Sequence, residues 1–187
     1  MFQGHSDTEL SADGLQQAEK LRDRLADEKI DVIYSSDLKR AVVTAETIAS
    51  RHKLNITTCS EIREINYGKV EKLTFDEIKQ LYPKVAELCI DWSLELKFPD
   101  GEGVGELEQR INKFLGRLKQ YTPEQTILIV AHGGPLRVMV CSLLGIGLEH
   151  WRQIYIDLAS LSIVHTHPEI AVLALLNDTS HLKSERE

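Results

Sequence analysis

His132 is the side chain whose surroundings best suit chemistry. It follows the uninterrupted apolar run Ile127–Ala131 and is followed at once by Gly133, Gly134 and Pro135. The run is typical of a strand buried on both faces of a parallel sheet, and glycines before a proline are typical of a tight turn that starts a helix. His132 would then lie at a strand end and before a helix N-terminus, where α/β proteins bind ligands and anions. The alternative is a strand-to-helix turn with an incidental histidine.

The segment around Arg40 could bind an anion. Ser35, Ser36 and Asp37 precede a predicted helix, and Arg40 lies in its first turn. Ser36 or Asp37 is a suitable N-cap. Free amides at a helix N-terminus, together with an arginine, make a good anion site. The alternative is a capped helix that carries Lys39 and Arg40 as a surface pair.

Glu64 could act as a general acid. It is flanked by isoleucines, and apolar surroundings raise the pKa of a carboxyl group, which can then donate a proton near neutral pH. Considered alone, an ordinary salt bridge with Arg63 is the simpler interpretation. The acidic, glycine-rich segment Phe98–Gly105 is either a mobile loop or a substrate lid.

A metal site has weak support in this sequence. His165 and His167 would share a face if they lay on one strand, but acidic or cysteine ligands do not accompany them. The sequence contains no GxGxxG, Walker or GxSxG motif, so dinucleotide, P-loop and serine-hydrolase functions have no support.

The composition fits one globular domain. The 187 residues are 42% hydrophobic and 27% charged, and the net charge of -7 argues against a nucleic-acid or anionic-membrane partner. A few arginines can still make a local anion pocket. Cys59, Cys89 and Cys141 form no CxxC pattern and are interpreted as reduced thiols, with Cys141 on the buried side of its helix. Without a membrane span or secretory signal, the cytoplasm is the expected location.

Alternating strands and helices must position these side chains. The periodicity predicts strands over Ile30–Tyr34, Leu54–Thr58, Thr126–Ala131, Ile154–Ile156, Ser160–Thr166 and Ile170–Asn177, the last two joined as a hairpin at His167-Pro168. It predicts helices over Ser11–Asp27, Leu38–Arg51, Thr74–Leu81, Lys84–Leu94, Glu106–Tyr121 and Pro135–Leu144. The first strand, helix and second strand make a right-handed βαβ unit with parallel strands.

Four segments in this order resemble the histidine phosphatase superfamily, also called phosphoglycerate mutase-like. They span nearly the whole chain: Tyr34–Glu46, Glu64–Gly68 with Leu73-Thr74, Ala131–Gly134 and Asn177–Leu182. The resemblance implies an α/β three-layer sandwich, with a mostly parallel central sheet, helices on both faces and a C-terminal antiparallel hairpin.

The superfamily's first motif, Arg-His-Gly at the end of the first strand, is absent from this sequence. Phe2–Asp7 resembles the loop that follows that motif in relatives, and His5 belongs to this loop and does not replace the nucleophile. We therefore expect residues 1–187 to be a single, N-terminally truncated domain that lacks the first central strand. Two strand edges would be unpaired, so another segment or chain would close the gap or the monomer would be marginal. Val70 and Lys72 also stand where the phosphatase branch usually has Trp and Gly, so the resemblance does not predict the shape of the pocket wall.

The resemblance implies phosphoryl transfer through a phosphohistidine, without a metal or other cofactor. Arg40 would clamp phosphate oxygens, His132 would donate to the transferring phosphoryl group, and Glu64 would protonate the leaving oxygen. Further substrate or phosphate contacts are expected at Gln3, Gly4 and Gly133.

A phosphomonoesterase acting on a small phosphorylated substrate is the leading hypothesis, closest to the bacterial α-ribazole phosphatase and broad-specificity branch. Without the nucleophile, the given residues should be weakly active or inactive. A phosphoglycerate mutase is an alternative, although Asp76–Gly105 is short and acidic where mutases carry a longer, basic insertion. A pseudo-phosphatase that binds a phosphorylated ligand or partner is a second, and a metal-binding protein using His165 and His167 a third. A homodimer is left open.

Overall fold

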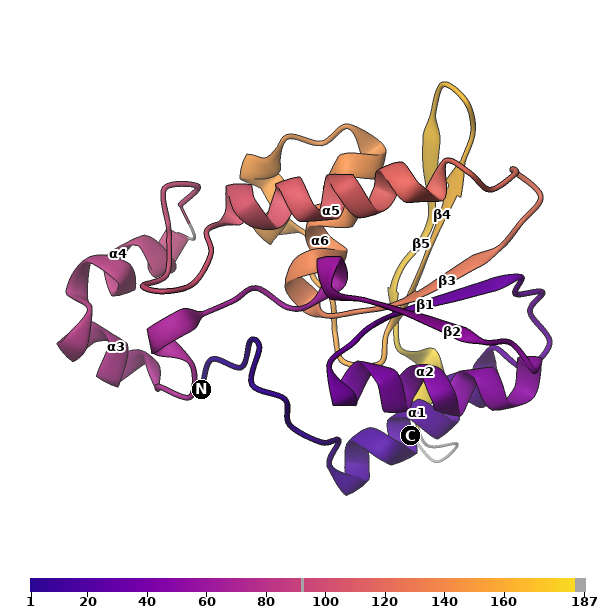
Figure 1. Cartoon of the computed structure of the whole chain (residues 1–187), viewed down its shortest axis with the longest axis horizontal. Coiled ribbons are helices and arrows are strands. Elements are labelled where there is room, and N and C mark those ends of the chain that lie inside the picture. The colour runs from indigo at the N-terminus through magenta and orange to yellow at the C-terminus, as the bar shows by residue number, and fades with distance from the viewer. Residues whose placement is uncertain (92, 184–187) are drawn as a thin grey trace.

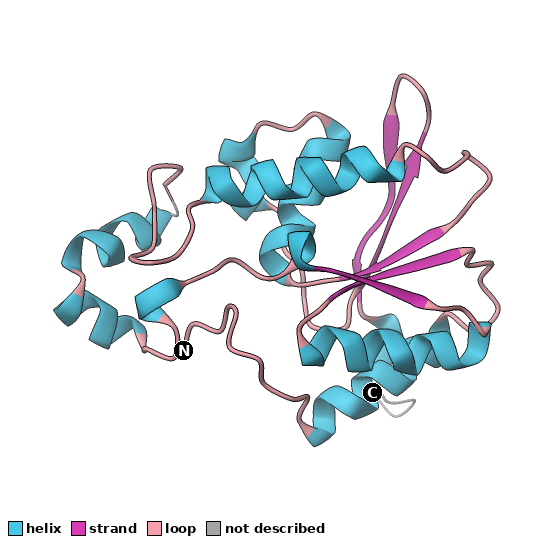
Figure 2. Ribbon diagram, in the orientation of Figure 1, coloured by secondary structure: helices cyan, strands magenta, loops and turns pink. Residues whose placement is uncertain are grey.

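Three parallel strands form the centre of the fold. The computed structural model describes residues 1–91 and 93–183. The strands β1 (Val32–Ser36), β2 (Ile56–Cys59) and β3 (Ile127–Val130) lie in the order β2-β1-β3 (Figure 2). Ser35 pairs with Val130 and Ser36 with Cys59, so the carboxyl ends of all three strands meet at one edge of the sheet. His132 follows β3 at this edge.

Helices cover both faces of the sheet and make three layers. Helices α1 (Ala12–Arg24) and α2 (Lys39–His52) lie on one face, and α5 (Val104–Leu118) and α6 (Gly133–Leu144) on the other (Figure 1). Successive residues of β1 serve the two faces: Ile33 packs with Ala45 of α2, while Tyr34 meets Phe114 of α5 edge-on at 5.4 Å. The predicted three-layer α/β architecture is confirmed.

In the part of the chain that the structure describes, the C-terminal strands β4 (Leu161–Thr166) and β5 (Ala171–Asp178) pair only with each other, as an antiparallel hairpin. Within the described residues, one edge of β3 pairs with β1 and its other edge has no strand partner. All four residues of β3 are half-buried. Ile127 and Ile129 pack against the main core, and Leu128 and Val130 pack against the clusters on the opposite face. Both faces of the strand are therefore covered as expected, although less completely than in a fully buried strand.

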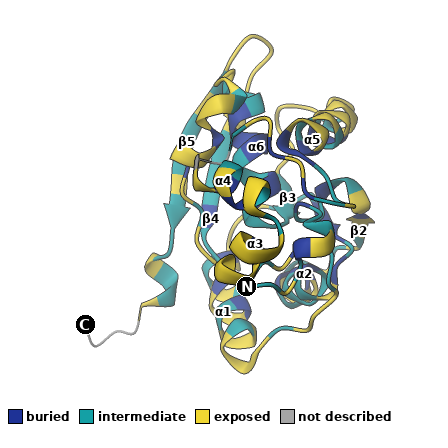
Figure 3. Cartoon of the chain, turned by 90° about the vertical axis from the view of Figure 1, so that its left-hand side faces the viewer, coloured by how far each residue is buried: buried dark blue, intermediate teal, exposed yellow. Residues whose placement is uncertain are grey.

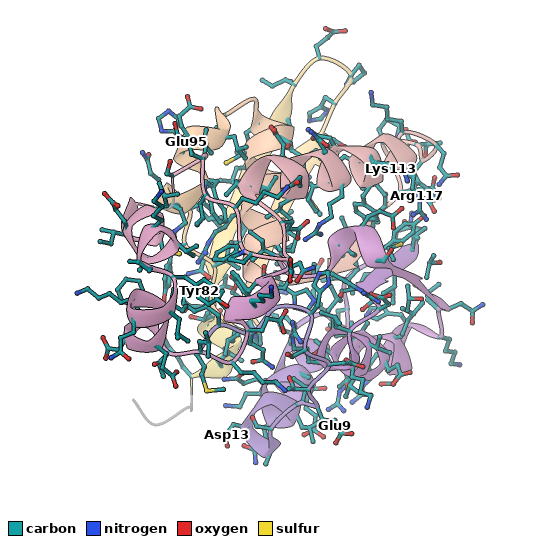
Figure 4. The ribbon with its side chains drawn as sticks, turned by 60° about the vertical axis from the view of Figure 1, so that its left-hand side comes forward. Glu9, Asp13, Tyr82, Glu95, Lys113 and Arg117 are labelled. Carbon is teal, nitrogen blue, oxygen red and sulfur yellow. The ribbon has the colours of Figure 1, made fainter. Side chains whose placement is uncertain are left out.

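The middle of the chain forms a group of short helices that shares the main core with α5 and α6. It comprises α3 (Phe75–Leu81), α4 (Pro83–Asp91) and the single-turn helices Ser60–Ile62 and Gly68–Val70. Tyr82, labelled in Figure 4, links α3 to α4 and packs against the main core. Figure 3 shows that the outer surface of α3 is largely exposed, in contrast to the buried interior.

The segment Phe98–Gly105 is held against the rest of the fold by packing, hydrogen bonds and an ion pair. Phe98 is buried in the main core, and the N–H of Glu102 donates to the carbonyl of Asn66 at 2.9 Å. The Glu102 carboxylate pairs with Arg110 at 2.6 Å. These contacts hold the segment in place, which favours neither the mobile loop nor the substrate lid.

Most predicted helices and strands are confirmed within two or three residues. Ser11 caps α1 by accepting from the N–H of Gly14 at 3.1 Å, and Cys141 faces the core. The predicted strand Ile154–Ile156 is wrong: this stretch follows the six-residue 3₁₀ helix Leu148–Gln153 and pairs with no strand among the described residues. Among the described residues, no helix combines the length and apolar character that a membrane crossing requires.

Candidate active site

Arg40 lies on the first turn of α2 and holds the N-terminal loop. Its guanidinium donates to the carbonyls of Gly4 at 2.8 Å and Ser6 at 3.0 Å, and the side chain is half-buried. It is therefore not part of an exposed surface pair. The predicted cap by Ser36 or Asp37 is wrong, because the carboxylate of Asp7 accepts from the N–H of Lys39 at 2.7 Å. Asp7 comes from the distant N-terminal loop, and sequence spacing could not reveal this contact.

The N-terminal loop is tied to the middle segment by Glu71. Its carboxylate accepts from the N–H groups of His5 at 2.6 Å and Ser6 at 2.8 Å. Burial acts to raise the pKa of Glu71, but the hydrogen bonds from Ser6 and His5 outweigh it, so the pKa is lowered overall. Gly4 has no room for a side chain, since a Cβ would overlap the carbonyl of Ile65. Gln3 is exposed and donates to the hydroxyl of Thr8.

His132 is the N-cap residue of α6, and its Nε2 lies 2.9 Å from the buried Oγ of Ser36. Burial lowers its pKa to about 3, with further lowering by the positive charges of Arg40, Arg110 and His5. The imidazole is therefore neutral at physiological pH. Its neighbours make this strand end electropositive, which suits an anion.

The carboxyl group of Glu64 lies at the first turn of α6. It accepts from the N–H groups of Ile65 at 2.8 Å and Gly134 at 3.1 Å. Burial raises the pKa of Glu64 despite these hydrogen bonds and the charges of Arg40 and Arg110. A Cβ on Gly134 would overlap the Glu64 carboxylate, whereas one on Gly133 would have no neighbour closer than 3.9 Å. Gly134 is thus required for the close approach of Glu64 to α6.

Arg110 of α5 fixes the backbone that carries Glu64. Its guanidinium donates to the carbonyls of Glu61 at 2.7 Å, Arg63 at 2.7 Å and Glu64 at 2.9 Å. The simpler interpretation of Glu64 as the ion-pair partner of Arg63 is wrong, since Arg63 pairs with Asp37 at 2.6 Å. Glu64 is left to interact with backbone amides and with the field of the arginines.

The structure thus brings three predicted side chains into one charged neighbourhood. Arg40 acts on the pKa of both Glu64 and His132, which come from different parts of the chain. Sequence reasoning missed Arg110, Ser36 as a partner of His132, and Glu71. Only the cluster of charges in the helix Glu106–Tyr121 could have drawn attention to Arg110.

A metal-binding arrangement has no counterpart in the described residues. No group of three or more His, Cys, Asp or Glu side chains there could hold a metal ion. His165 lies on β4, but His167 lies beyond its end, in the hairpin turn. The two histidines therefore do not share a strand face as the metal hypothesis required.

Comparison with known proteins places this fold in a family. The family description "Histidine phosphatase superfamily (branch 1)" matches residues 1–179, so the chain belongs to this superfamily and the resemblance seen in the sequence is confirmed. The chain is 34% identical over 181 residues to phosphoserine phosphatase 1 of Hydrogenobacter thermophilus, covering 97% of this chain and 86% of that protein. It is 29% identical over 178 residues to the adenosylcobalamin/alpha-ribazole phosphatase of Escherichia coli, covering 95% and 87%.

Solved structures agree with the sequence relatives. The alpha-ribazole phosphatase from Shigella flexneri superposes with a TM-score of 0.89 at 30% identity, covering 95% of this chain and 88% of that one. The native mycobacterial glucosyl-3-phosphoglycerate phosphatase superposes with a TM-score of 0.87 at 25% identity, covering 95% and 91%. Related proteins with the same fold therefore include phosphatases named for different substrates.

Proposed function

We propose that this chain is a phosphomonoesterase of the histidine phosphatase type. Arg40 binds phosphate oxygens, His132 donates to the phosphoryl group in transfer, and Glu64 protonates the leaving oxygen. Gln3, Gly4 and Gly133 are proposed to line the substrate site. The observation that carries the proposal is the position of the Glu64 carboxyl group, which accepts from the N–H of Gly134 at the first turn of α6 and lies in the field of Arg40. Desolvation raises the pKa of Glu64, which favours the protonated form that can donate to a leaving oxygen.

His132 is proposed as the supporting histidine and not the attacking one. Its neutral imidazole can donate only one hydrogen bond, and its Nε2 already lies beside Ser36. The reaction type requires a histidine that accepts the phosphoryl group, and the given sequence has no Arg-His-Gly triplet. We therefore expect the 187-residue polypeptide to hydrolyse aryl phosphates weakly or not at all.

The substrate is proposed to be a small phosphomonoester, with α-ribazole 5'-phosphate as one candidate. The names of the relatives in Escherichia coli and Shigella flexneri support this candidate, and that of the Hydrogenobacter relative supports phosphoserine. A mutase is disfavoured because the segment Asp76–Gly105 is acidic. A non-catalytic role, binding a phosphorylated ligand or partner, is the second candidate and is favoured by the missing triplet.

Binding and turnover separate these functions. Calorimetry with inorganic phosphate should detect binding that Arg40→Gln weakens by at least about tenfold, as expected for loss of a charge-assisted contact. Arg51→Gln, at the exposed far end of α2, is the matched control. Unchanged phosphate affinity in Arg40→Gln would contradict the proposed site. Hydrolysis of p-nitrophenyl phosphate at a rate typical of intact relatives, abolished by His132→Ala, would show that His132 is the nucleophile.

A further inference from the structure

Helix α6 carries a further arginine close to the candidate site. Arg137 lies three residues after Gly134, so both residues face the same side of α6. A Cβ on Gly134 would overlap the Glu64 carboxylate, which places that side of the helix next to the proposed proton donor. The Nε of Arg137 is buried and has no hydrogen-bond partner among the described residues. A buried guanidinium nitrogen in this state favours an anionic ligand.

Arg152 brings a second guanidinium to the same place. It belongs to the six-residue 3₁₀ helix Leu148–Gln153, which packs against α6, and its guanidinium lies 5.8 Å from the centre of the Trp151 ring. The side chain of Arg152 is exposed but partly desolvated, which lowers its pKa, and the charge of Arg137 lowers it further. The two cations therefore repel each other, and an anion bound between them would remove this repulsion.

Tyr67 connects the two arginines to Glu64. Tyr67 lies three residues after Glu64, and its ring packs edge-on against that of Phe98, with 4.9 Å between the ring centres. Burial and the charge of Glu64 raise the pKa of Tyr67, while the charges of Arg152 and Arg137 act in the opposite direction. Glu64, Tyr67 and the two arginines thus lie within electrostatic reach of one another.

We propose that Arg137 and Arg152 form an anion subsite for the leaving group of the substrate, which makes the substrate a phosphomonoester of an acidic alcohol. This inference rests on the proposed function: if Glu64 protonates the leaving oxygen, the leaving alcohol lies beside Glu64 and next to the arginine pair. A carboxylate or a second phosphate accepts bidentate hydrogen bonds from arginine. The subsite therefore favours an acidic leaving group over α-ribazole, which has no acidic group.

Matched ligands test the subsite by calorimetry. Phosphoryloxy carboxylates of two to five carbons are compared with alkyl phosphates of equal length, and alkanediol bisphosphates test phosphate as the second anion. At least one acidic ligand should bind at least about tenfold more tightly than its alkyl partner, as expected for one charge-assisted contact. Arg137→Gln and Arg152→Gln should abolish this preference and leave alkyl phosphate affinity unchanged. Arg24→Gln, which removes an exposed ion pair on α1, is the control.

The outcomes separate the subsite from the phosphate site. Alkyl phosphate binding that Arg40→Gln weakens, without any preference for an acidic partner, overturns the subsite and keeps the proposed function. A preference that survives both substitutions also overturns it. If no ligand binds, or if Arg40→Gln changes nothing, the proposed function fails and the inference with it. Arg152 is exposed, so Arg152→Gln decides the question if Arg137→Gln does not fold.

Discussion

The Nε2 of His132 lies 2.9 Å from the Oγ of Ser36, so a side-chain hydrogen bond joins the carboxyl ends of β3 and β1. Ser36 is fully buried, and its hydroxyl also accepts from the N–H of Leu38 at 3.3 Å. The serine therefore connects the imidazole to the start of α2, which carries Arg40. Two parts of the candidate site share one small polar group.

Ser36→Ala should lower the free energy of unfolding by roughly 1 to 3 kcal/mol, because it leaves a buried imidazole nitrogen without its partner. Urea denaturation measures this loss. Ser50→Ala, on the exposed side of α2, is the control and should change stability by less than about 0.5 kcal/mol. Equal stability of the two variants would mean that the Ser36–His132 hydrogen bond contributes nothing.

The low pKa of His132 predicts a dependence of stability on pH. The folded state has a pKa of about 3 and the unfolded state about 6.5, so the unfolded state binds more protons between these values. Stability should therefore fall as the pH drops below 6.5, by roughly 2 kcal/mol between pH 7 and pH 5. Urea denaturation of the wild type and of His132→Asn at both pH values isolates this effect. If both proteins show the same pH dependence, the imidazole is not buried in its neutral form.

Gly134 and Gly133 make a matched pair for testing the approach of Glu64 to α6. Gly134→Ala should destabilise the protein by roughly 1 to 3 kcal/mol, because the new methyl group overlaps a buried carboxyl group. Gly133→Ala meets no atom closer than 3.9 Å and should be tolerated. Thermal unfolding of the two variants gives the comparison. A greater loss in Gly133→Ala would place the Glu64 carboxyl elsewhere.

Arg110→Met should destabilise the protein by about 3 kcal/mol or more, because three carbonyls lose their donor and the half-buried Glu102 carboxylate loses its cationic partner. The double variant Arg110→Met/Glu102→Met should lose less free energy of unfolding than the two single variants lose together, since the carboxylate left without its cation is then removed as well. Chemical denaturation of the double-mutant cycle measures this coupling. Strict additivity would contradict a direct interaction. Arg117, labelled in Figure 4, pairs with Glu61 at the surface, and Arg117→Met should cost little.

The sequence predicted the local parts well and the long-range contacts poorly. Periodicity located the helices and the three parallel strands, because each buries one continuous face. The motifs identified Arg40, Glu64 and His132 as candidate site residues. Spacing could not show that Asp7 caps α2 or that Arg110 holds the backbone of Glu64, since these contacts join segments more than 30 residues apart. The strand predicted at Ile154–Ile156 failed because its apolar residues pack without a neighbouring strand.

The hydrogen bonds from Arg40 to Gly4 and Ser6 have a thermodynamic consequence. The guanidinium proposed to bind phosphate also orders the N-terminal loop, so the loop and the anion depend on one preorganised cation. By linkage, any change that frees the loop, such as loss of the Asp7 contact with α2, adds an entropic cost to anion binding. Bound phosphate would in turn protect the loop from proteolysis to the same extent, in free energy, as loop order strengthens phosphate affinity.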